Sequence, residues 1–227
     1  MEKESEDRKK IVNAVESLVD ENRVMNFSDA IFAFAATLLV LKIDLPVIVG
    51  GSVTDQLPSM LVNLWPQYLA NIITFFIIGV YWLNHHAVFG LIRKYNKMLV
   101  WMNIVFLMSV AFLPFPVDLY GDYSSNPVVI GFFALSLAIV GYLLAAIWIY
   151  ASTNHRLVDK ALSKRRIKFY TMEYLVAPVI FTISIPLAII HPAIAQLSWL
   201  LILFGVMLVN HFAKYKRLDE VEKVAAA

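Results

Sequence analysis

PVVIGFFALSLAIVGYLLAAIWIYA, residues 127–151, is a long stretch that contains no charged side chain. At about 1.5 Å per residue, a helix of this length is long enough to cross about 30 Å of hydrocarbon. Lipid offers no partners to backbone N–H and C=O groups, so a stretch that crosses it has to satisfy them internally. We therefore predict that residues 127–151 form a transmembrane helix.

Five further apolar stretches lie on either side of this one, and together they predict an all-α membrane protein with six transmembrane helices. The composition agrees, because only 16% of the residues are charged, against about 25% in soluble domains. One stretch, 174–190, is long enough only if its helix begins near Phe169. The six stretches are 27–49, 59–82, 98–117, 127–151, 174–190 and 193–213.

The basic residues lie between alternate pairs of stretches. All of the 19 Lys and Arg except Lys42 fall before the first stretch or after the second, fourth or sixth. The other three connections carry Asp55, Asp118 and Asp122 but no Lys or Arg. The positive-inside rule then places both termini in the cytoplasm. A miscount by one helix would destroy this alternation, so the asymmetry also supports six helices.

The chain divides into one membrane unit and two short cytoplasmic segments. Residues 1–22 repeat apolar side chains at helical spacing from Ile11 to Leu18, which predicts an amphipathic helix lying on the membrane or on its own protein. Residues 23–213 form the six-helix transmembrane unit, and residues 214–227 form a charged tail.

The sequence lacks the signatures of common catalytic and metal sites. It has no Cys, no H-E-x-x-H helix, no P-loop and no G-x-S-x-G turn. Its one pair of histidines is His85-His86, placed at the cytoplasmic end of the second helix. Neighbouring side chains on a helix point about 100° apart, so the two do not readily share one metal ion. We predict no enzyme activity, no cofactor, and a structural or gating hydrogen bond at this pair.

The first stretch differs from the others because charged residues lie near both of its ends. Such residues tend to face protein or water, although Ser28 or Asp29 could also simply cap a helix. At about 100° per residue, one face of this helix has polar groups at its ends and bulky apolar groups between them. This face either lines a pore or packs as core. Its members are Phe27, Ala30, Phe34, Thr37, Leu41 and Asp44, with Leu38 at the border.

The run Arg23-x-x-x-Phe27-Ser28-Asp29-Ala30, at the start of the first helix, resembles the signature of the transmembrane protein 175 family of potassium channels. The likeness covers nearly the whole chain, with six helices, cytoplasmic termini and a His after the second helix. It implies a prokaryotic homotetramer in the cell membrane. In such a channel the first helix of each subunit lines a central pore, and no re-entrant filter loop is present.

The resemblance also implies roles for single residues. The pore constriction falls at Phe34, where family members usually carry Ile or Leu, and Thr37 contributes to K⁺ preference by contacting the ion transiently. Leu38 and Leu41 form further apolar rings. The motif residues that are implied to be structural or gating are Arg23, Phe27, Ser28 and Asp29, with His85 or His86 as their partner.

We therefore predict a homotetrameric, potassium-preferring cation channel, because six helices with one lining face do not enclose an axial pore and four copies do. Its expected partners are K⁺ and other monovalent cations, further copies of the chain and the lipid bilayer, with no nucleic acid. Two alternatives stay open. A secondary transporter or exchanger would usually show repeats and midplane charges, and neither is evident. A membrane scaffold would use the first helix as core.

Overall fold

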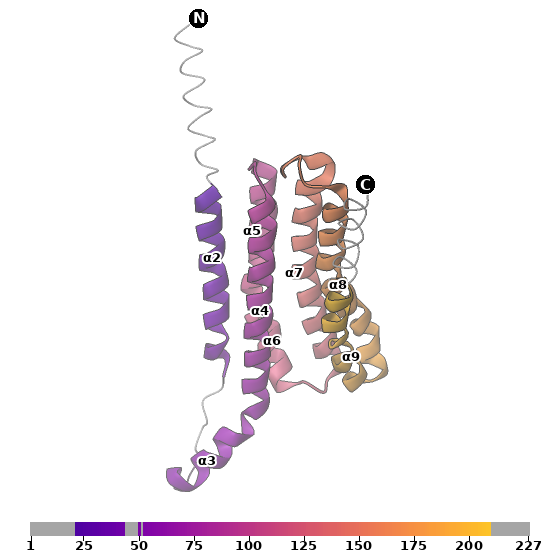
Figure 1. The fold of residues 1–227 in the computed structure, drawn as a ribbon. Coiled ribbons are helices and arrows are strands. Elements are labelled where there is room, and N and C mark those ends of the chain that lie inside the picture. Colours follow the sequence, from indigo (N-terminus) through magenta and orange to yellow (C-terminus); the bar gives the residue numbers. More distant parts are fainter. Residues whose placement is uncertain (1–20, 44–49, 51, 210–227) are drawn as a thin grey trace, which may run out of the picture.

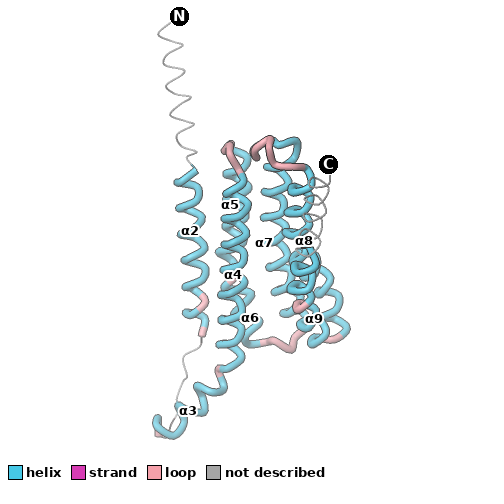
Figure 2. Tube along the Cα trace, viewed as in Figure 1, coloured by secondary structure: helices cyan, strands magenta, loops and turns pink. Residues whose placement is uncertain are grey.

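The computed structural model describes residues 21–43, 50 and 52–209. Their regular structure is helical, apart from an isolated antiparallel bridge between Ile92 and Val158, and the long helices stand side by side (Figures 1 and 2). The elements are α2 (Glu21–Leu38), η1 (Val40–Lys42), α3 (Val53–Asn63), α4 (Trp65–Leu91), α5 (Lys97–Phe112), α6 (Pro114–Asp122), α7 (Pro127–Ser152), η2 (Thr153–His155), α8 (Lys164–Ile190) and α9 (Pro192–Ser198), and residues 201–209 are also helical.

The uncharged stretch forms α7, whose side chains are the most thoroughly buried of any described helix. The helix begins at Pro127, and the Asn126 side chain before it accepts a hydrogen bond from the N–H of Val128 at 2.9 Å. This cap satisfies an amide that has no partner within the helix. Near the other end, Trp148 Nε1 donates to Thr171 Oγ1 of α8 at 3.0 Å. The core of the protein is therefore built around α7.

Helices α7 and α8 approach each other closely at Gly141. A Cβ atom added there would lie 2.9 Å from Pro178 Cβ and 3.0 Å from its Cγ and Cδ. These atoms belong to a ring that cannot rotate away, so only glycine permits this packing.

We expect Gly141→Ala to destabilise the protein by about 1–3 kcal/mol, because the added methyl group overpacks this contact. The matched control is Gly79→Ala on α4, where an added Cβ meets no atom within 4 Å and where alanine is the better helix former. Thermal unfolding of the two purified variants in the same detergent measures the difference. Equal melting temperatures for both variants would contradict the close packing of α7 on α8.

Five described helices are long and apolar enough to cross a membrane, which confirms the prediction of an all-helical membrane protein. Three of the five combine consecutive elements: α5 with α6, α7 with η2, and α9 with the helical residues up to Val209. The five ranges are Trp65–Leu91, Lys97–Asp122, Pro127–His155, Lys164–Ile190 and Pro192–Val209. Helix α2 is not among them, because its 18 residues include Glu21, Arg23 and Asp29. A sixth crossing by α2 therefore stays a prediction.

Four helix boundaries differ from the predicted ones. The stretch 59–82 is divided at Leu64, because Pro66 lacks an N–H and suits the first turn of a new helix. Helix α4 then continues to Leu91, so both histidines lie within it and not at its end. The stretch 174–190 is part of α8, which begins at Lys164 and is long enough to cross. Helix α2 ends at Leu38, so Leu41 lies on the 3-10 turn that follows.

Two basic connections share one end of the bundle, the end at which α2 begins (Figure 1). The backbone N–H groups of Arg93 and Lys94 donate to the Leu157 carbonyl at 2.8 and 3.1 Å, and Asn96 Nδ2 donates to Tyr150 OH at 2.9 Å. Segments far apart in sequence are thereby joined at this end. The predicted N-terminal amphipathic helix and the charged tail lie almost wholly outside the described residues.

Candidate functional site

Helix α2 has one face that packs against its own chain and one that does not. Ser28, Phe32 and Ala35 lie on the packed face and are buried. On the opposite face, 54% of Phe27 and 58% of Phe34 are exposed. The exposed face includes Ala30 and Thr37 as well, which the sequence also predicted to line a pore. These side chains are left uncovered by the rest of the described chain.

The packed face of α2 is tied to α4 and α5 by a buried chain of hydrogen bonds. His85 Nε2 lies 2.9 Å from Asn103 Oδ1, Asn103 Nδ2 donates to Ser28 Oγ at 2.9 Å, and Ser28 Oγ donates to the Val24 carbonyl at 2.9 Å. His85, Asn103 and Ser28 are at most 1% exposed. Since an amide oxygen only accepts, His85 carries its proton on Nε2. One consistent direction of donation therefore runs from α4 through α5 to α2.

Aromatic rings hold the His85 imidazole in place. It stacks on Phe89 with ring centroids 4.2 Å apart and on Phe106 at 5.5 Å, and Phe32 of α2 meets its edge at 5.6 Å. With Nε2 protonated, Nδ1 is a bare acceptor, and it has no hydrogen-bond partner among the described residues. The ring is thus fixed by packing as well as by Asn103.

Asp29 makes a second, more exposed connection between α2 and α4. Trp82 Nε1 donates to Asp29 Oδ1 at 2.9 Å, and His86 Nε2 lies 3.5 Å from the same oxygen. His86 Nδ1 lies 3.2 Å from the Trp82 carbonyl. The sequence left open which histidine pairs with the motif. In the structure both contact motif residues: His85 is linked to Ser28 through Asn103, and His86 lies against Asp29.

The other predicted residues of α2 lie along or beside its exposed face. Arg23 is exposed in the first turn, and Leu38 is half-buried. The Thr37 hydroxyl donates to the Phe34 carbonyl at 2.9 Å, which leaves the oxygen lone pairs available to a cation. Leu41, on η1, is 77% exposed. Among the described residues no group of three His, Asp or Glu side chains could hold a metal ion.

Asn103 and Trp82 are members of this site that were not predicted. A signal for Asn103 was present, because an amide within the apolar stretch 98–117 needs a partner. Its partner could not be identified, since it lies 75 residues away in sequence. Trp82 gave no comparable signal, because an indole near the end of an apolar stretch is common at membrane interfaces.

Comparisons with known proteins agree on one family. Residues 23–114 match the family described as endosomal/lysosomal potassium channel TMEM175. A potassium channel of Chamaesiphon minutus is 35% identical over 180 residues, which cover 75% of this chain and 85% of the relative. The human endosomal/lysosomal proton channel TMEM175 is 27% identical over 139 residues, 61% of this chain and 27% of that protein.

A solved structure is also similar. It is the crystal structure of a TMEM175 homologue from Chamaesiphon minutus that is described as a lysosomal potassium-selective channel homologue. The TM-score is 0.69 at 27% sequence identity, and the match covers 84% of this chain and 98% of the other.

Proposed function

Because the chain belongs to the TMEM175 family, whose members are ion channels and not enzymes, we propose that it is a potassium-preferring cation channel. The observation that carries this proposal is the division of α2 into an anchored face and an exposed face. A helix that only filled the core would bury its bulky side chains, whereas Phe34 is 58% exposed.

In the proposed assembly, four copies surround an axis and the exposed face of each α2 lines the pore. Helix α2 is the sixth crossing, both termini are cytoplasmic, and the channel lies in the plasma membrane of a prokaryote. A closed ring is the usual form of such an oligomer. Asp29 of α2 is then held against Trp82 and His86 of α4, and the other charges of α2 face other subunits and water, in keeping with the cost of placing charges in lipid.

The lining residues have different roles that follow from their chemistry. A ring of four Phe34 side chains forms an apolar constriction that gates by excluding water. One turn further along, four Thr37 hydroxyl oxygens replace part of the hydration shell of K⁺, since their protons are already donated to backbone carbonyls. Leu38 and Leu41 continue the apolar lining.

The motif residues act as supports for this lining. Ser28, through Asn103 and His85, fixes one side of α2 to α4 and α5. Asp29 binds α4 through Trp82 and His86. Arg23 and Phe27 stand at the cytoplasmic mouth. A change in these contacts would tilt α2 and alter the distance between facing Phe34 rings.

Single-channel recording from the purified protein in planar bilayers tests the proposal. We expect unitary currents whose reversal potential follows the K⁺ gradient more closely than the Na⁺ gradient. A proton gradient is applied separately, because a human relative bears the name of a proton channel. Saturating flux that requires a second ion would instead show an exchanger, and no flux in wild type or in any pore-widening variant would refute the channel.

A further inference from the structure

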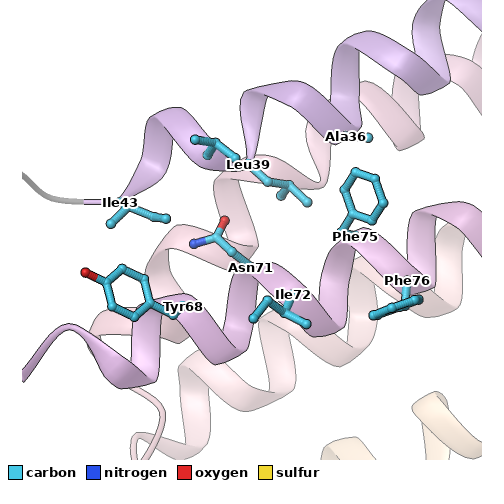
Figure 3. A pocket seen from close by; sticks show the side chains of 9 residues that line it. Ala36, Leu39, Ile43, Tyr68, Asn71, Ile72, Phe75 and Phe76 are labelled. Atoms are coloured by element: carbon cyan, nitrogen blue, oxygen red, sulfur yellow. The ribbon is translucent and has the colours of Figure 1, made fainter. Parts of the chain in front are cut away.

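An apolar cavity of about 420 Å³ lies between the end of α2 and the first half of α4. Figure 3 shows side chains from both segments around it, among them Ala36 and Leu39 on one side and Ile72, Phe75 and Phe76 on the other. Its volume lies in the range of about 300–1,000 Å³ that is typical of small-molecule sites. The rim is apolar too, since Phe75 and Phe76 are more than half exposed, so the cavity opens onto an apolar part of the surface.

One buried polar atom in the cavity wall is without a partner. Asn71 is 8% exposed, and its Nδ2 donates to the Gln67 carbonyl at 2.9 Å. Its Oδ1 makes no hydrogen bond within the described structure, and in Figure 3 this oxygen points into the space between α4 and the end of α2. A buried acceptor left unsatisfied is costly, most of all where no water is at hand. The site therefore calls for a donor from outside the part of the chain that the structure describes.

The polar and apolar groups of the cavity lie at different depths. Tyr68 and Asn71 are in the first two turns of α4, which begins at the end of the bundle opposite the basic loops (Figure 1), whereas Phe75 and Phe76 lie one turn further in. A lipid of the leaflet at that end has the same order, with its head outward and its chain inward. The described wall carries no Lys, Arg, Asp or Glu to bind a charged head, so a neutral hydroxyl fits best.

We propose that this cavity binds a neutral single-chain amphiphile of the bilayer, such as a fatty alcohol or a monoacylglycerol. Its hydroxyl donates to Asn71 Oδ1, and its chain lies against Ile72, Phe75 and Phe76. Water alone does not suit the cavity, because a bound water needs two to four polar partners and the wall is almost entirely apolar.

The cavity lies directly behind the proposed pore lining. Ala36, Leu39 and Val40 contribute to its wall, and Thr37 and Leu38 are their neighbours in sequence. An occupant would act as a wedge between α2 and α4 and would fix the position of α2. This effect on conduction rests on the proposed channel function, whereas binding does not, so the two are measured separately.

Photolabelling of the full-length protein in nanodiscs tests the binding. The probe is a twelve-carbon alcohol with a diazirine in its chain, and the matched probe is its methyl ether, which cannot donate. We expect the alcohol to label α2 and α4 around the cavity about tenfold more efficiently than the ether, which corresponds to about 1.4 kcal/mol. Asn71→Leu should remove this difference, and Asn63→Leu, at an exposed position of α3, should keep it. Equal labelling by both probes in wild type would overturn the proposal.

The oligomeric state and melting temperature of Asn71→Leu provide the second test. If the natural donor is a lipid, removing the unsatisfied acceptor leaves the lipid-free assembly intact and raises its melting temperature. If the donor comes from a neighbouring subunit, the same change weakens the assembly, and the lipid assignment is wrong. Flux is then recorded with and without the alcohol, and an unchanged flux alongside specific labelling would count against the wedge effect and not against the site.

Discussion

Asn103→Ala is expected to lower the free energy of unfolding by about 2–3 kcal/mol. The change removes both hydrogen bonds that join His85 to Ser28 and leaves the buried His85 N–H without an acceptor. It also opens a cavity at a residue that is 1% exposed. Hydrogen bonds between membrane helices average under about 1 kcal/mol each, so the orphaned group and the cavity supply most of the effect. Thermal unfolding in detergent should show a fall of about 5–10 °C.

Asn26→Ala is the matched control, because Asn26 lies on α2 but is exposed, and it should leave the melting temperature almost unchanged. A double-mutant cycle with Ser28→Ala then measures the coupling within the buried chain. Ser28→Ala removes one of the bonds made by Asn103, so its effect should be much smaller in the Asn103→Ala background than in wild type. Simple additivity of the two changes would show that the chain of hydrogen bonds does not act as a unit.

The parts of the fold that follow from composition and charge could be predicted. Residues 127–151 could only be a buried or membrane helix, and α7 differs from that range by a single residue. The alternation of basic and acidic connections predicted that the connections after α4 and after α7 share one end, and they are joined there by the hydrogen bonds to Leu157. Apolar composition and the charge of the connections are each summed over many residues, so one misassigned residue does not change the prediction.

Boundaries and side-chain partners could not be predicted with the same certainty. The stretch 59–82 is apolar throughout its middle, yet Pro66 starts a new helix, and hydropathy alone does not register that break. Likewise, no helix-breaking residue marks the end of α2 at Leu38.

Partners are harder still, because they depend on how helices are placed around one another. Both histidines sit next to each other in sequence, but a rotation of about 100° sends His85 into the core and His86 toward Asp29. The motif residues were predicted from the resemblance to a known family. Asn103, the amide that links His85 to Ser28, is identified only by the structure.

Phe34→Ala is expected to raise K⁺ flux at least about tenfold, which is the largest functional effect that we predict. In a four-fold ring the substitution removes four aromatic side chains at once from the proposed constriction. A wider, less apolar ring holds water more readily and lowers the barrier to a hydrated ion. Because Phe34 is 58% exposed in the subunit, its loss leaves little unfilled space in the core, and the melting temperature should hardly change.

Two further variants test whether a rise in flux comes from the pore or from a leak through the bilayer. Phe204→Ala removes an equally large side chain that is 69% exposed on the last described helix, and it should leave flux unchanged if that face meets lipid. Phe34→Leu should give an intermediate flux, because leucine is smaller than phenylalanine but keeps the ring apolar. Flux that is unchanged in Phe34→Ala, in a protein that still assembles, would move the constriction away from Phe34 and leave Leu38 and Leu41 as the remaining apolar rings. An equal rise in Phe204→Ala would instead indicate a leak through a disturbed bilayer, and the exposed face of α2 would then be a lipid-facing or packing surface.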